Sequence, residues 1–169
     1  IFKGDEIADY THDVKTGRDS YYFYSDTQDA KGDRANLVVD IDTQMSRSAV
    51  SRSTTFDEDN LRSETFYNLN GTKGEERAWY AYNYNSLGKV IKDTAIYAYE
   101  TGGTRETERM TESNTYKGKV SSGDINSPIL ATNPLQSTTY YYLDTTGLTQ
   151  KIFKGDEIAD YTHDVKTGR

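Results

Sequence analysis

The chain has no cysteine, only two prolines and no long apolar run in its 169 residues. Without cysteine it can form no disulfide, no thiolate metal site and no cysteine nucleophile. A helix that crosses a membrane needs about 20 mainly apolar residues in a row, so no membrane-spanning segment is predicted here. Positive charge is also scarce, since 20 Lys and Arg stand against 27 Asp and Glu. Nucleic acid is therefore not expected as a partner, because its phosphates need a basic face.

Apolar residues make up only 34% of the chain, which is little for a compact core. The composition is nevertheless not that of a disordered chain, because it includes 15 tyrosines, five phenylalanines and one tryptophan. Tyrosine, threonine and valine favour strands, and tyrosine suits a half-wet surface because its ring is apolar and its hydroxyl polar. We therefore predict an extended β structure with much solvent-facing sheet and a small core.

The first eighteen residues, IFKGDEIADYTHDVKTGR, recur unchanged as the last eighteen, 151 residues further on. Identity over that length is not chance. The simplest interpretation is a tandem repeat, in which residues 1–151 form one full period and residues 152–169 begin the next identical period. An engineered duplication, for example an added strand that closes a barrel or permits domain swapping, is the alternative.

Strand-like runs alternate with short turns along the period, and helical periodicity is weak everywhere. Residues 37–41 are the most apolar short run and are predicted as a core strand. Asn70-Gly71 predicts a two-residue hairpin, because both residues tolerate positive φ. The other predicted strands are residues 21–24, 43–56, 64–67, 77–84, 89–99, 104–116 and 138–143, with a loop at 123–135.

A shorter motif recurs inside the period: aromatic, spacer, aromatic, short polar residue, two further residues, glycine. The cleanest copy is YNYNSLG at residues 82–88. In such a segment alternate aromatics share one face of a strand, the polar side chain caps a turn, and glycine supplies positive φ. We predict ladder tyrosines at Tyr82, Tyr84, Tyr97, Tyr99, Tyr141 and Tyr142, and turn residues at Asn70, Gly71, Asn85, Gly88, Gly103, Asp144 and Gly147.

These copies resemble the YD repeat of the Rhs family, whose pattern reads Tyr-x-Tyr-Asp-x-x-Gly-Arg-Leu. The family includes bacterial Rhs toxins, the shell subunit of Tc toxin complexes, and teneurins. The resemblance implies an all-β fold in which repetitive hairpins wind into a spiral sheet, although Lys89 and Leu148 stand where the pattern has Arg. Since identical units related head to tail generate a helix, we expect an open helical tube or fibre instead of a closed shell.

No enzyme activity is predicted. His12 lies beside Asp13, with Ser20 a few residues on, but a Ser-His-Asp site needs three groups that converge in space. The sequence has no nucleophile elbow, so His12 is interpreted as a turn or surface residue. Its copy is His163, which leaves one histidine per period.

No cofactor is predicted either. The acidic runs at residues 40–42 and 57–60 offer carboxylate oxygens, but neither has the ligand spacing of an EF-hand loop. They are interpreted as solvated turns, with weak Ca²⁺ binding as the alternative.

The pattern as a whole predicts a structural repeat unit of an extracellular filament or tube, self-assembling or continuously wound, serving as a sheath, surface fibre or spacer. Its partner is expected to be itself, as adjacent repeats of one long chain or as identical chains head to tail. Because unpaired sheet edges invite association, an isolated period is expected to fold poorly or to self-associate. The first alternative is a tandem β-sandwich adhesin module that binds a glycan or a surface protein. A carbohydrate-active enzyme would need paired carboxylates, and no spacing points to such a pair.

Overall fold

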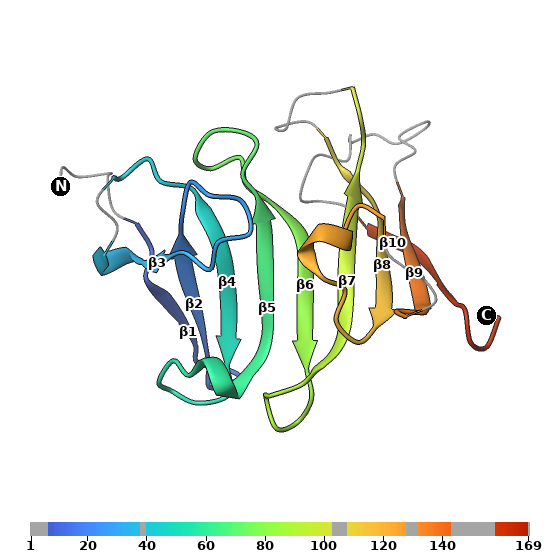
Figure 1. Ribbon diagram of the computed structural model, residues 1–169, viewed down its shortest axis with the longest axis horizontal. Helices are drawn as coiled ribbons and strands as arrows, with labels where there is room; N and C mark the ends of the chain where they lie inside the picture. The colour runs from blue at the N-terminus through green and yellow to red at the C-terminus, as the bar shows by residue number, and fades with distance from the viewer. Residues whose placement is uncertain (1–6, 38–39, 103–107, 128–131, 143–157, 169) are drawn as a thin grey trace. The chain divides into compact units, whose positions relative to one another are not determined.

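The computed structural model describes residues 7–37, 40–102, 108–127, 132–142 and 158–168 (Figure 1). These residues form β-strands and three short 3₁₀ segments, η1 (Ala35–Leu37), η2 (Glu58–Asn60) and η3 (Ser122–Asp124), with no α-helix among them. No helix in this described part is long and apolar enough to cross a membrane. The strands are β1 Tyr10–Asp13, β2 Arg18–Tyr24, β3 Asp33–Arg34, β4 Met45–Ser51, β5 Leu61–Asn68, β6 Arg77–Tyr84, β7 Ile91–Tyr99, β8 Met110–Lys117, β9 Leu135–Tyr142 and β10 Ile158–Asp164.

The ten strands form an antiparallel sheet in the order β1-β2-β4-β5-β6-β7-β8-β9-β10, with β3 paired to β2 beside this path. Apart from β3, each strand thus pairs with its neighbours along the chain, and the order is open at β1 and at β10. The all-β, hairpin-based prediction is confirmed at this level. Two compact units, residues 1–92 and residues 93–169, divide the chain within the predicted period.

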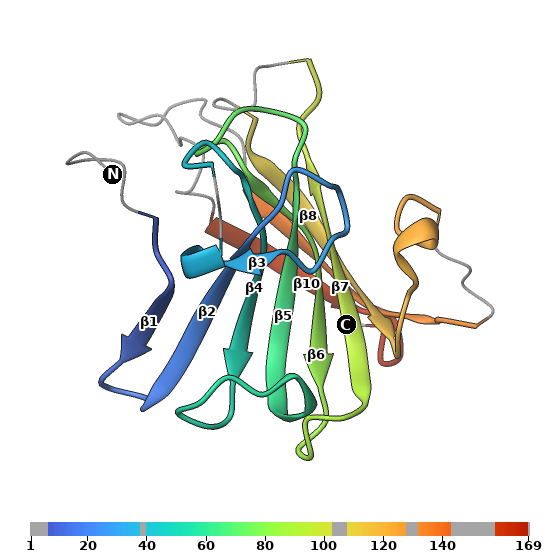
Figure 2. The same cartoon turned by 60° about the vertical axis from the view of Figure 1, so that its left-hand side comes forward.

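The first unit builds its core on one face of β2, β4, β5 and β6, which run side by side (Figure 2). Side chains directly opposite each other on neighbouring strands share a face, so the register creates rows that cross the sheet. Two such rows make the core: Tyr21, Ala49, Glu64 and Tyr82 in one, and Phe23, Arg47, Phe66 and Tyr80 in the other.

A charged side chain lies at the centre of this core. Arg47 is 1% exposed, and its guanidinium lies 4.0 Å from the centre of the Phe23 ring. It donates to Glu64 at 3.0 Å and to Glu58 at 2.7 Å, so the buried charge is both paired and stacked on an aromatic face. The Tyr84 hydroxyl donates to the second oxygen of Glu64. Burial, followed by the Glu64 carboxylate, raises the pKa of Tyr84, so this donor keeps its proton at neutral pH.

The second unit begins within β7, and its strands β7 to β10 pair in sequence order. Its buried centre is small: Thr94 and Val120 are fully buried, and Ile125 is nearly so. The Thr94 hydroxyl donates to the Gly118 carbonyl at 2.7 Å and accepts from the Val120 amide at 3.0 Å. A polar side chain thus fixes the segment after β8 onto the sheet where apolar residues are few.

The prediction of a core strand at residues 37–41 is wrong. Leu37 ends η1 and is 64% exposed, and Ile41 is 38% exposed. Asp40 forms a turn, since its carboxylate accepts from the Asp42 amide at 2.9 Å and its carbonyl from the Thr43 amide at 3.2 Å. Residues 38 and 39 lie outside the described residues. The long strand predicted at 43–56 is also shorter, since β4 ends at Ser51. By contrast, the aromatic strands predicted at 77–84 and 89–99 are present as β6 and β7.

Replacing Arg47 by methionine should lower the free energy of unfolding by about 3–5 kcal/mol, because Glu64 would remain buried without its cation. The matched control is Lys31→Met, which breaks an exposed ion pair to the same Glu58 and should cost less than about 1 kcal/mol. Urea unfolding followed by the fluorescence of Trp79, the single tryptophan, measures both. Equal losses in the two variants would contradict a central role for Arg47.

Candidate functional site

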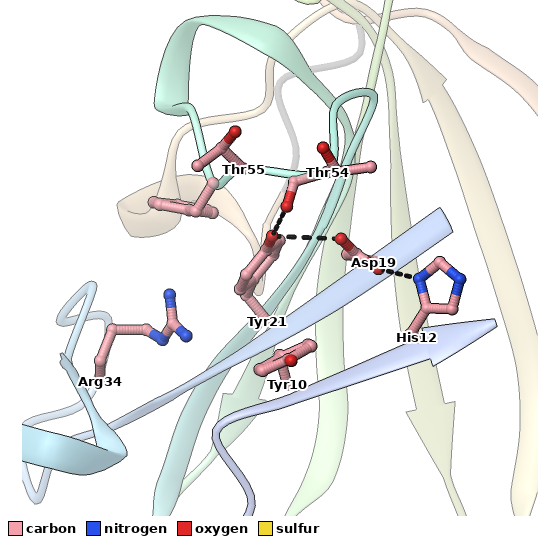
Figure 3. A pocket seen from close by; sticks show the side chains of 8 residues that line it. Tyr10, His12, Asp19, Tyr21, Arg34, Thr54 and Thr55 are labelled. Carbon is pink, nitrogen blue, oxygen red and sulfur yellow. Dashed lines mark hydrogen bonds and ion pairs between the residues drawn. The ribbon is translucent and has the colours of Figure 1, made fainter. Parts of the chain in front are cut away.

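A pocket of about 550 Å³ opens in the first unit, where β1 and β2 meet the segment that follows β4 (Figure 3). Aromatic rings and polar groups share its wall. Its lining residues are Tyr10, His12, Asp19, Tyr21, Arg34, Thr54, Thr55 and Phe56.

The turn between β1 and β2 sets the geometry of this pocket. The Asp13 carbonyl accepts from the Gly17 amide at 2.7 Å, and its carboxylate accepts from the amides of Lys15 and Thr16. These bonds, that from Thr16 first, lower the pKa of Asp13. Gly17 closes the turn with φ +65. The resulting register places the residue at position 10 opposite 21 and the residue at position 12 opposite 19, all on one face.

His12 and Asp19 form the polar side of the pocket. His12 Nδ1 lies 2.5 Å from Asp19 Oδ1, with the histidine side chain 47% exposed and the aspartate 6%. The second oxygen of Asp19 accepts from the Tyr21 hydroxyl at 3.4 Å, and that hydroxyl also donates to the Thr54 carbonyl at 3.0 Å (Figure 3). Burial, and then the charge of Asp19, raises the pKa of Tyr21, so its hydroxyl remains a donor.

The opposite side of the pocket is aromatic and cationic. The Tyr21 ring lies 5.2 Å from the Phe56 ring and 5.9 Å from the Tyr10 ring, measured between centroids. The Arg34 guanidinium lies 4.7 Å from the centre of the Tyr21 ring and donates to both oxygens of Asp9 at 2.6 Å. Ring faces beside fixed hydrogen-bonding groups suit a small ligand that has an apolar face and hydroxyl groups.

The structure does not gather the His-Asp-Ser set that lies close in sequence. The carboxylate on His12 belongs to Asp19, while Asp13 caps the turn. Ser20 lies between Asp19 and Tyr21 on β2, and successive strand residues point to opposite faces, so it points away from the pocket. Among the described residues, no group of three or more His, Cys, Asp or Glu side chains could hold a metal ion.

Asn85 and Gly88 form the turn that follows β6. Asn85 Oδ1 accepts from the amides of Lys89 and Val90 at 3.3 and 3.4 Å. Gly88 has φ +74, and a β-carbon on it would lie 2.7 Å from the Cα of Asn60. Glycine is needed here both for the backbone conformation and for the close approach of a second backbone segment.

The two-residue hairpin predicted at Asn70-Gly71 is wrong. β5 ends at Asn68 and β6 begins at Arg77, so the connection has eight residues, and Gly74 supplies the positive φ. Three of its amides donate to side chains close by in sequence: Asn70 to Asn68 at the end of β5, Thr72 to Glu75, and Gly74 to Glu76. These bonds stabilise a longer loop.

The three remaining predicted turn residues, Gly103, Asp144 and Gly147, lie outside the described residues. Next to Gly103, Gly102 has φ +96. The same hairpin is held by Glu100, whose carboxylate accepts from the Arg109 backbone and guanidinium. These bonds lower the pKa of Glu100 to about 2.

The predicted ladder tyrosines lie on three strands: Tyr82 and Tyr84 on β6, Tyr97 and Tyr99 on β7, and Tyr141 and Tyr142 on β9. Tyr82 is buried in the core beside Phe66, with ring centroids 6.0 Å apart. The structure contains two further stacked tyrosine pairs that the sequence did not predict, Tyr10 with Tyr21 and Tyr140 with Tyr161. Once the turn at residues 14–17 is fixed, counting back along both strands identifies the first pair, and the same count identifies His12 with Asp19.

Comparison with known proteins gives no match for this chain, whether to a family model, a curated protein or a solved structure. Its function is therefore inferred from its own geometry.

Alanine substitutions at Gly17 and Gly88 should separate the energetic cost of positive φ from the cost of a steric clash. Gly17→Ala places alanine at φ +65 in open space and should cost about 1–2 kcal/mol of unfolding free energy. Gly88→Ala has a similar φ penalty but also forces Asn60 to move, which should add about 1–3 kcal/mol. Thermal or urea unfolding compares them, and a smaller loss for Gly88→Ala would refute the packing argument.

The pocket makes a second prediction. Tyr21→Phe removes the hydroxyl that donates to the Thr54 carbonyl and to Asp19, and should lower the free energy of unfolding by about 1–2 kcal/mol. Tyr22→Phe removes a hydroxyl that bonds only to the exposed Thr11 among the contacts described, and should change it by less than about 0.5 kcal/mol. If the Tyr22 variant loses as much as the Tyr21 variant, the pocket-side bonds do not stabilise the fold.

Proposed function

We propose that the chain is a structural repeat unit of an extracellular filament or tube, in which successive periods extend one antiparallel sheet. One observation carries the proposal: the same eighteen-residue sequence supplies both end strands of the sheet order, β1 and β10. A sheet that begins and ends with the same strand can be lengthened by whole periods, because each added period brings the same strand pairs again.

The turn after each copy supports this continuation. Asp164 repeats the bonds of Asp13, since its carboxylate accepts from the amides of Lys166 and Thr167 and its carbonyl from that of Gly168. Gly168 has φ +68, against +65 at the first copy. The second copy therefore ends in the turn that, in the first copy, leads into β2.

The partner in this proposal is the next copy of the same sequence. The extracellular location, the spiral winding and the membership of the YD-repeat class rest on the sequence resemblance.

A ligand-binding module is the second candidate, and the pocket favours it. Three rings (Tyr10, Tyr21 and Phe56) lie beside the His12–Asp19 pair, an arrangement that suits a glycan. It is the tandem β-sandwich adhesin module that the sequence left as the alternative, with this pocket as its binding site.

Chains of one, two and four periods test the proposal. If periods extend one sheet, the urea midpoint should rise with the number of periods, because each junction adds interface free energy. Electron micrographs should show continuous rods or tubes that lengthen by a constant step. The control is a four-period chain in which a Gly/Ser linker of equal length replaces each junction copy. A midpoint independent of period number, together with separate beads, would support the adhesin-type module instead.

A further inference from the structure

We propose that the duplicated segment is a strand shared between periods: residues 158–164 pair through one edge with β9 of their own period, and through the other with β2 of the next period in the same chain. This inference rests on the proposed function and specifies its interface. It is carried by a difference between the two copies, which use opposite backbone edges.

In the first copy, the backbone bonds of β1 identify the edge that faces β2. The Asp9 carbonyl accepts from the Tyr22 amide at 3.1 Å, and the Asp13 carbonyl accepts from the Gly17 amide. Alternate residues of a strand direct their N–H and C=O groups to the same edge. Since β1 pairs with β2 without a register shift, positions 9, 11 and 13 face β2, and positions 10, 12 and 14 face away.

In the second copy the edges are exchanged. The Val165 amide donates to the Gln136 carbonyl of the β9 side at 2.8 Å. Val165 is the counterpart of Val14, and β10 pairs with β9 without a shift from Tyr161 to Asp164. The counterparts of positions 10, 12 and 14 therefore face β9. From Tyr161 to Asp164, the edge that β1 gives to β2 is therefore the edge that β10 does not use for β9, so a single strand can satisfy both neighbours there.

The side chains permit both pairings at once. In the first copy Tyr10 stacks on Tyr21, and in the second its counterpart Tyr161 stacks on Tyr140, with ring centroids 5.9 and 4.8 Å apart. Residues directly opposite one another lie on one face of a sheet, so the three rings would form one ladder across three strands. Tyr10 and Tyr161 are each 56% exposed, as expected of a ring that has only one of two neighbours.

The threonine at the next position can also bond to both neighbouring strands. The Thr11 hydroxyl bonds to the Tyr22 hydroxyl at 3.0 Å, and its counterpart Thr162 bonds to Thr139 at 2.8 Å. One hydroxyl can donate to one of these groups and accept from the other.

The histidine position is also compatible with two neighbours. His12 binds Asp19, whereas its counterpart His163 lies opposite Thr138. Thr138 donates its hydroxyl proton to Asn114 at 2.5 Å, so it does not donate to the imidazole nitrogen that would contact Asp19.

Amide hydrogen exchange, resolved by NMR, tests the opposite edges in the 169-residue chain itself. In the first copy the Thr11 amide should exchange at least about tenfold more slowly than those of Tyr10 and His12. In the second copy the order should reverse, with Tyr161 and His163 protected and Thr162 fast. In a chain of two periods, all three amides of the junction strand should be protected. The same protected set in both copies, or a fast Thr162 at the junction, overturns the shared strand.

Proline substitutions at one sequence position give an independent readout, because proline is tolerated only where its missing N–H faces solvent. Thr11→Pro should abolish β1–β2 protection in the 169-residue chain, whereas Thr162→Pro should leave His163 protected. In the two-period chain Thr162→Pro should lower the urea midpoint toward that of one period. An unchanged midpoint there would refute the sharing. The shared strand and the filament can fail separately. If micrographs show rods while the Thr162 amide at the junction exchanges fast, the shared strand is wrong and the filament stands. If the junction amides are protected but micrographs show separate beads, the filament is wrong and the shared strand stands.

Discussion

The pairing of Arg47 with Glu64, with the Arg47 cation stacked on the Phe23 ring, is the interaction on which the first unit depends. The chain has few apolar residues, and in one of the two core rows a guanidinium lies between Phe23 and Phe66 in place of an aliphatic side chain. Phe23 lies against one face of that cation, and Tyr84 occupies the remaining oxygen of its carboxylate partner. Stacking and charge-assisted hydrogen bonds thus take over the role that aliphatic packing has in richer cores.

The sequence could predict some strands of this sheet but not the charged residue at its core. Aromatic runs such as residues 77–84 identified strands correctly, because rings that alternate with small residues fit a pleated, half-buried surface. The apolar run at residues 37–41 misled, because hydrophobicity alone does not show that Leu37 ends a 3₁₀ segment and that Asp40 forms a turn. Arg47 could not be identified as a core residue, since its burial depends on Glu64 and Phe23, which only the register of three strands brings together.

Only part of the pocket could be predicted from the sequence. Its turn could be anticipated, because Asp13 and Gly17 have the residue types that cap and close a hairpin. Its polar pair could not be found by looking for catalytic neighbours in sequence, since the partner of His12 lies seven residues away across the turn. The loop carrying Phe56 completes the wall, and nothing in the local sequence shows where that loop folds.

The opposite edges of β1 and β10 also give any assembly of these units a direction. The edge of β1 that faces away from β2 carries positions 10, 12 and 14, while the edge of β10 that faces away from β9 carries Thr162 and Asp164, the counterparts of positions 11 and 13. The two tips of a finite fibre would therefore present different hydrogen-bonding patterns, although one sequence makes both. Such a fibre is polar in the sense used for cytoskeletal filaments: a cap or an anchor that fits one tip would not fit the other.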